Sequence, residues 1–169
     1  MTVDDLAVLA GAGLVTLATA RAGSAPGAAP HRRIPSQYAD PASWAVLAAV
    51  DRLWSGIPPE ATAMVLVSTY STIDTMSAIA GAVPGGRLSP LRFAGASAGG
   101  PVSLVCQVHG LRGPTLVITT APPDGCPAAL TMARHWLRTG AASQVVVALH
   151  EHDPVRGHEV QCVVVGAAR

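Results

Sequence analysis

Short, almost entirely apolar runs alternate along this chain with segments in which apolar residues recur at helical spacing. Residues 63–68 (AMVLVS) and 115–120 (TLVITT) are such runs, as expected of strands buried on both faces of a parallel sheet. Residues 6–17 form a similar run punctuated by glycines, and residues 144–149 and 159–165 follow near the C-terminus. Strands that alternate with helices indicate an α/β domain with a mainly parallel sheet.

The segments between these runs predict helices. Asp40-Pro41 offers an N-cap followed by proline in the first turn, and the helix it opens should end near Gly56. Further helices are predicted over residues 71–83, 102–109 and 127–138. About ten residues join the last two strands, fewer than a helical crossover needs, so these strands should form a hairpin. We expect one domain, residues 1–169, with a five-stranded, mostly parallel sheet whose last strand is antiparallel.

Composition argues against several classes of protein. Hydrophobic residues make up 50% of the chain, yet no run of about 18 apolar residues is uninterrupted, so no membrane helix is expected. Asp4 and Asp5 precede the most apolar stretch, residues 6–20, which argues against a signal peptide. The formal net charge is +1 and the arginines are scattered, so nucleic-acid binding has no support. Three cysteines without framework spacing favour a reducing, cytoplasmic location.

A five-residue turn, Gly110-Leu111-Arg112-Gly113-Pro114, precedes the expected strand at residues 115–120. It is similar, residue for residue, to the turn that leads into the nucleophile-bearing strand of ketosynthases. Residues 125–151 likewise resemble the helix, glycine turn and strand that follow the nucleophile in that family. This resemblance implies the N-terminal half of the thiolase fold, with helices on both faces of the sheet.

Two departures from the family concern catalysis. Ketosynthases carry their nucleophile in a Thr-Ala-Cys motif at a strand-to-helix turn, where the helix N-terminus favours the thiolate. The matching residues here are Thr120-Ala121-Pro122, and proline supplies no nucleophile. Both catalytic histidines of the family lie in its second half, which we expect to be missing here. The resemblance therefore implies a truncated chain that catalyses no condensation and uses no cofactor.

Two residues that follow Pro122 are candidates for any remaining catalysis. Cys126 stands four positions later, and we expect it to pack in the core as a small hydrophobe rather than to react. Asp124 is expected to cap the following helix with its carboxylate, with a role as general acid or base as the alternative.

Residues of metal-binding type gather near the expected hairpin: His150, His152, His158 and Cys162. A closed zinc site usually takes two pairs of ligands, each pair closely spaced in the sequence. Only His150 and His152 form such a pair here. We therefore interpret these side chains as solvated polar groups of the hairpin and expect no metal. Gly11-x-Gly13 resembles the start of a dinucleotide loop but lacks the third glycine and the acidic partner.

The resemblance also implies an interaction surface. Ketosynthases dimerise by pairing the strand before the nucleophile across a two-fold axis, and an exposed edge strand needs such a cover. The corresponding interface residues here are Thr115, Leu116, Val117, Ile118 and Thr119. The expected partners are a ketosynthase and its chain-length factor, with an acyl carrier protein as a further partner. We expect homo- or hetero-oligomers.

The first functional hypothesis is a non-condensing, ketosynthase-like accessory subunit of a type II polyketide synthase. This class of synthase includes those that form polyenes. The alternative is an enzyme that assists cyclisation, isomerisation or dehydration of a polyketide or polyene chain, with polar groups such as Asp124, Ser97 and Thr120. A third interpretation is a fragment without function, against which the orderly final hairpin argues.

Overall fold

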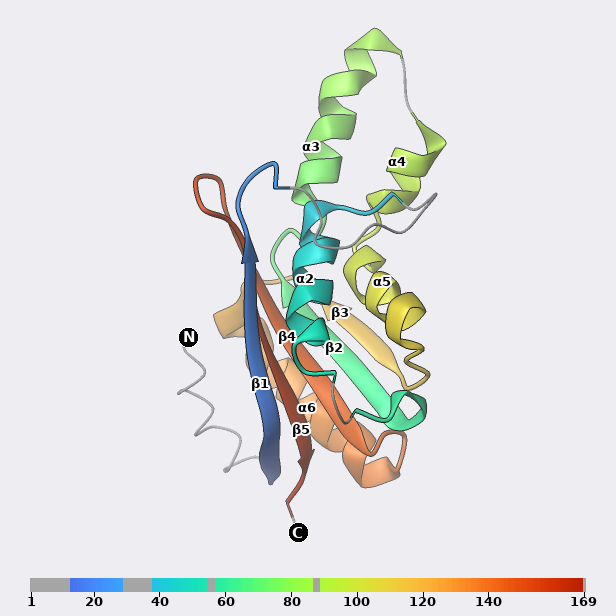
Figure 1. Ribbon diagram of the computed structural model, residues 1–169, viewed down its shortest axis with the longest axis vertical. Helices are drawn as coiled ribbons and strands as arrows, with labels where there is room; N and C mark the ends of the chain where they lie inside the picture. Colours follow the sequence, from blue (N-terminus) through green and yellow to red (C-terminus); the bar gives the residue numbers. More distant parts are fainter. Residues whose placement is uncertain (1–12, 29–37, 55–56, 87–88, 169) are drawn as a thin grey trace.

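The computed structural model describes residues 13–28, 38–54, 57–86 and 89–168. These residues form a five-stranded sheet in the order β1-β5-β4-β2-β3 (Figure 1). The strands are β1 (Leu14–Ser24), β2 (Thr62–Ser68), β3 (Thr115–Ile118), β4 (Gln144–Asp153) and β5 (Gly157–Ala167). β2 runs parallel to β3 and β4, whereas β5 runs antiparallel to β4 and β1. Only the last strand opposes the others, which confirms the prediction.

Helices cover both faces of the sheet, as predicted. α2 (Pro41–Asp51) and α5 (Gly100–His109) lie on one face, and α6 (Pro122–Thr139) lies on the other (Figure 1). α3 (Ile73–Ala82) and α4 (Pro90–Gly95) extend beyond one end of the sheet. Short 3-10 turns occur at Pro59–Ala61 and Val83–Gly85. None of the described helices is long and apolar enough to cross a membrane.

The interior strand β2 explains why the apolar runs are continuous. All of its residues are buried. Met64 and Leu66 pack into the core under α2 and α5, while Val65 and Val67 pack into the core under α6. Because successive side chains of a strand point to opposite faces, a strand with helices on both sides is apolar at nearly every position.

The turn that resembles the ketosynthase motif joins α5 to β3. Gly110 follows α5 with φ 71°, a left-handed conformation that glycine adopts without steric cost. Gly113 lies against the backbone of β2: its N–H donates to Thr62 O at 3.2 Å. A Cβ added to Gly113 would come within 2.6 Å of the Thr62 carbonyl carbon. Met64 N–H then donates to Pro114 O at 3.0 Å, so the turn sets β3 beside β2.

Three elements depart from the sequence prediction. β1 spans Leu14–Ser24 rather than residues 6–17, of which residues 6–12 lie outside the described part of the chain. β1 is an edge strand, so it tolerates the exposed threonine and arginine side chains that conceal it in the sequence. α6 begins at Pro122 rather than at residue 127, because the first helical turn needs no N–H donor and accepts proline. α4 has no counterpart in the prediction.

Candidate functional site

A cavity of about 640 Å³ lies at the end of the sheet where β1, β2 and β4 finish. In open α/β sheets, ligands commonly bind at the carboxyl ends of the strands. The main segments that line the cavity are residues 21–25, residues 68–70, residues 121–123 at the start of α6, and residues 150–153 and 156–159 of the β4–β5 hairpin. This cavity is the candidate site.

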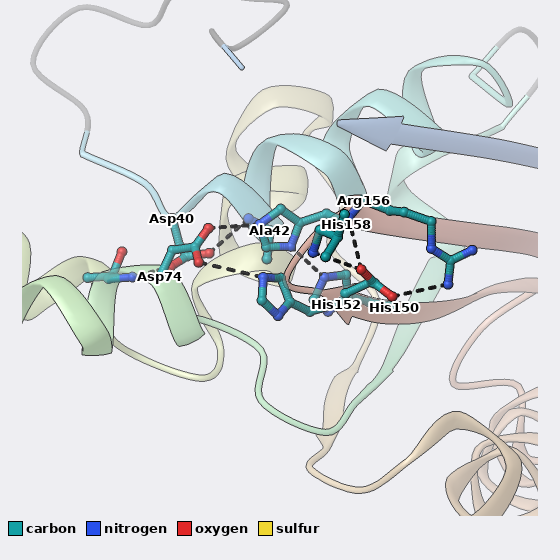
Figure 2. A network of polar contacts seen from close by, with 10 residues as sticks. Asp40, Ala42, Asp74, His150, His152, Arg156 and His158 are labelled. Carbon is teal, nitrogen blue, oxygen red and sulfur yellow. Dashed lines mark hydrogen bonds and ion pairs between the residues drawn. The ribbon is translucent and has the colours of Figure 1, made fainter. Parts of the chain in front are cut away.

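A chain of hydrogen bonds runs beside the cavity (Figure 2). Ser68 Oγ lies 2.7 Å from His150 Nδ1, and His150 Nε2 lies 3.0 Å from His158 Nδ1. His158 Nε2 lies 2.9 Å from Asp74 Oδ2. His152 Nε2 lies 3.7 Å from Asp74 Oδ1. Three imidazoles and a carboxylate therefore lie close together.

The register of the sheet brings these side chains together. Ser68 ends β2 and stands opposite His150 on the neighbouring strand β4. His152 of β4 stands opposite His158 of β5. Because alternate residues of a strand share a face, His150 and His152 point to the same side. Asp74 comes from the first turn of α3.

Without a bound ion, the hydrogen bonds are consistent with the following arrangement of protons. Ser71 has φ 46°, an uncommon left-handed conformation for a residue other than glycine, and donates its N–H to Ser68 Oγ at 2.9 Å. In this arrangement the Ser68 hydroxyl donates to His150 Nδ1. His150 Nε2–H then donates to His158 Nδ1, and His158 Nε2–H donates to Asp74. Burial, with the nearby His158 and His152, lowers the pKa of His150 to about 3, so His150 is neutral at physiological pH.

The expectation that the hairpin histidines are solvated is wrong. His150 and His158 are 2% and 3% exposed, because β4 extends to Asp153 and β5 begins at Gly157, which places them within the sheet. Cys162 does not join them: it is buried in the core under α2 and α5, where burial raises its pKa to about 12.

Asp74 is the residue that sequence reasoning missed. It bonds to His158, 84 positions away along the chain. Its own segment carries no motif, and helical spacing indicates only that residues 71–83 form a helix. No local pattern therefore predicts that this carboxylate meets the hairpin.

The residues proposed from the nucleophile motif fall in different places. Pro122 is buried in the first turn of α6 and lines the cavity. Asp124 is exposed and does not line it. The expectation that Asp124 caps α6 is wrong, because the N-cap residue is Ala121 and no side chain caps the helix. Cys126 is buried in the core under α6, and burial raises the pKa of its thiol.

The strand predicted as an interface lies at the edge of the sheet. β3 pairs with β2 on one side and with no described strand on the other. Among the described strands, none pairs with its outer backbone edge, and unpaired edges of this kind favour pairing with another chain. Thr115 and Thr119 are exposed, and Leu116, Val117 and Ile118 are half-buried.

One group of described residues could hold a metal ion. Asp74, His152 and His158 each offer one ligand atom, and these atoms all lie within 4.8 Å of one another. The group takes one residue from α3, one from β4 and one from β5.

No protein family and no curated protein matches the chain by sequence, but solved structures do match its fold. The ishigamide ketosynthase/chain length factor matches with a TM-score of 0.73 and 16% identity, over 92% of this chain and 62% of the other. The ketosynthase ApeO in complex with its chain length factor ApeC, from Xenorhabdus doucetiae, matches with a TM-score of 0.69 and 12% identity, over 92% of this chain and 79% of the other.

A third match links the fold to a carrier protein complex. In AntDE:AntF, a type II polyketide synthase acyl carrier protein is in complex with its ketosynthase bound to the hexaketide. This match has a TM-score of 0.65 and 11% identity, over 91% of this chain and 63% of the other. The chain thus has the thiolase-type fold of ketosynthases and chain-length factors, and it spans less than two thirds of the first and third of these chains.

Proposed function

We propose that this protein is a non-condensing, ketosynthase-like accessory subunit of a type II polyketide synthase, polyene-forming ones included. It associates with a ketosynthase and its chain-length factor and influences how the growing chain is processed. The observation that carries the proposal is Pro122, which occupies the first turn of α6 directly after β3. In ketosynthases this strand-to-helix turn holds the catalytic cysteine, and proline cannot attack an acyl thioester.

The open edge of β3 supports association with a partner of the same fold. Since Met64 N–H donates to Pro114 O, the backbone groups of Thr115 and Val117 point away from β2. Unpaired strand edges favour pairing with a second chain. A ketosynthase that offers the equivalent strand would complete a continuous sheet across the interface.

A second surface also supports a protein partner. α3 and α4 extend beyond the sheet (Figure 1), and several large apolar side chains on and between them are exposed: Met76, Val83, Leu91 and Phe93 are 50%, 54%, 64% and 67% exposed. Such gatherings of exposed apolar residues commonly mark interaction sites. The neighbours named above are complexes of ketosynthases, chain length factors and an acyl carrier protein, and we propose the same classes as partners here.

Co-purification tests the proposal. The chain is co-expressed with a tagged ketosynthase/chain-length-factor pair, and the complexes are analysed by size-exclusion chromatography with light scattering. Thr115→Arg combined with Thr119→Arg places two bulky charges beside the outer edge of β3, and charged side chains on an edge strand disfavour pairing with another strand. We expect this variant to lose association.

The matched control is Thr131→Arg, an exposed threonine on α6, which should keep association. If the β3 variant associates as well as the control, β3 is not the interface. If the unaltered chain neither binds the pair nor alters its products, the proposed function is refuted.

The buried histidine chain favours one second candidate: an enzyme that assists cyclisation, isomerisation or dehydration of a polyketide or polyene chain. His150 and His158 line the cavity, and the partly exposed His152 could transfer a proton to or from a molecule held there. We expect His152→Gln to remove one product conversion while assembly stays unchanged, and His135→Gln, on the exposed side of α6, to have no effect. Equal product profiles for the two variants would exclude this candidate.

A further inference from the structure

We propose that Asp74, His152 and His158 bind a divalent transition-metal ion of the zinc class at the rim of the cavity. This inference concerns a site that the proposed subunit role does not require. It rests on three independent features of the described residues: the separations of the ligand atoms, the hydrogen bonds behind one ligand, and the open side of the group.

The separations of the ligand atoms suit a tetrahedral ion. Bonds of about 2.0–2.1 Å at a tetrahedral angle separate neighbouring ligand atoms by about 3.3–3.4 Å. His158 Nε2 lies 2.9 Å from Asp74 Oδ2, and His152 Nε2 lies 3.7 Å from Asp74 Oδ1. These two distances end on different oxygens of the Asp74 carboxylate, and one ligand atom from each of the three residues lies within 4.8 Å of the others. Side-chain rotation that closes these separations to the required value would complete the geometry. Two imidazoles and a carboxylate are also the ligands of many three-residue zinc sites.

The hydrogen bonds behind His158 match those of a metal ligand. A metal on Nε2 leaves the proton of His158 on Nδ1, which would donate to His150 Nε2 at the observed 3.0 Å. His150 would then donate from Nδ1 to Ser68 Oγ, which can accept this bond together with that from Ser71 N. Metal-bound histidines nearly always donate their other N–H to a fixed partner. The chain of hydrogen bonds therefore remains complete when its protons reverse direction.

The group is buried on one side and open on the other. The His158 side chain is 2% exposed, that of His152 is 18% exposed and that of Asp74 is 40% exposed. Both histidines line the cavity. Three protein ligands with a fourth position facing a cavity characterise zinc sites that bind an exchangeable water or a ligand oxygen. An ion here would also tie the first turn of α3 to the β4–β5 hairpin.

Direct metal titration of the full chain tests the proposal. The protein is freed of its affinity tag, stripped with a chelator, and titrated with Zn²⁺ against a chromogenic chelator of known affinity. We expect one ion per chain, and Co²⁺ in its place should give the intense visible absorption of a tetrahedral site. His152→Ala and Asp74→Asn should each weaken binding by roughly 10–100-fold or more, since second-sphere changes alone have effects of that size.

His135→Ala, an exposed histidine on α6, is the matched control and should leave the affinity unchanged. Circular dichroism confirms that each variant is folded before titration. Binding that survives in both ligand variants places the ion elsewhere and overturns the proposal. Absence of stoichiometric binding in the unaltered chain overturns it as well.

Discussion

Gly113→Ala tests whether the glycine turn before β3 is required by the close approach of two backbones. The added Cβ would lie within 2.6 Å of the Thr62 carbonyl carbon and 2.8 Å of Ala63 N. These are backbone atoms of β2, so they cannot rotate away as a side chain could. β3 must instead retreat from β2, which strains the bonds from Gly113 N to Thr62 O and from Met64 N to Pro114 O.

The expected loss of stability follows from these contacts. Overpacking costs about 1–3 kcal/mol, and two weakened hydrogen bonds cost about 0.5–1.5 kcal/mol each. The free energy of unfolding should therefore fall by about 2–6 kcal/mol. For a chain of this size the melting temperature should fall by roughly 4–24 °C. Urea unfolding followed by circular dichroism measures the free-energy change directly.

Gly81→Ala is the matched control. Gly81 lies inside α3, has no positive φ and has no atom within 4 Å of an added Cβ. Alanine there should stabilise the protein by about 0.5–1 kcal/mol, because it favours the helix and restricts the unfolded chain. A Gly113→Ala variant within about 0.5 kcal/mol of the unaltered protein would refute the steric argument.

Further predictions concern three other positions. Asp40→Ala should lower the free energy of unfolding by about 2–4 kcal/mol in urea melts. The fully buried Asp40 carboxylate accepts hydrogen bonds from Ala42 N and Thr75 N, both at 2.8 Å, and so joins the starts of α2 and α3. A loss below about 1 kcal/mol would contradict this prediction. Pro122→Cys should create a thiol but no condensation of acyl and malonyl thioesters in a radiolabel assay, and chain elongation by this variant would contradict the non-condensing assignment. Burial raises the pKa of Cys162 from 9.0 to about 12. Between these two pH values the unfolded chain therefore binds fewer protons than the folded chain. The free energy of unfolding should fall as pH rises through this window, by at most about 1.4 kcal/mol per pH unit. Cys162→Ala should flatten this slope in urea melts at several pH values, and equal slopes would show that other groups cause the loss.

The fold was predictable where burial is the same along a whole segment. β2 is buried on both faces and matches the predicted strand to within one residue. The hairpin follows from the short link between the last two strands, and the helices at α3 and α5 follow from their spacing. β1 was misplaced because an edge strand mixes exposed polar and buried apolar positions. The early start of α6 was hidden by prolines, which usually indicate loops but are accepted in a first helical turn.

The candidate site was only partly predictable. The sequence draws attention to His150, His152 and His158, but it does not reveal that two of them are buried. Their burial depends on how far the strands of the hairpin extend and on the packing of neighbouring elements. Ser68 appears in the sequence only as the last residue of a strand, and its bond to His150 depends on the register between β2 and β4.

The sequence by itself determined the layered α/β architecture, the antiparallel last strand and the identity of Pro122 at the strand-to-helix turn. These properties depend on local periodicity, on the length of a link and on residue identity, all of which are present in the chain before it folds. The tertiary structure alone decided that Asp74 meets His152 and His158 and that β3 lies at an open edge. Both depend on which strands and helices become neighbours. Asp74 and His158 are 84 positions apart along the chain, so no local sequence pattern could predict their contact.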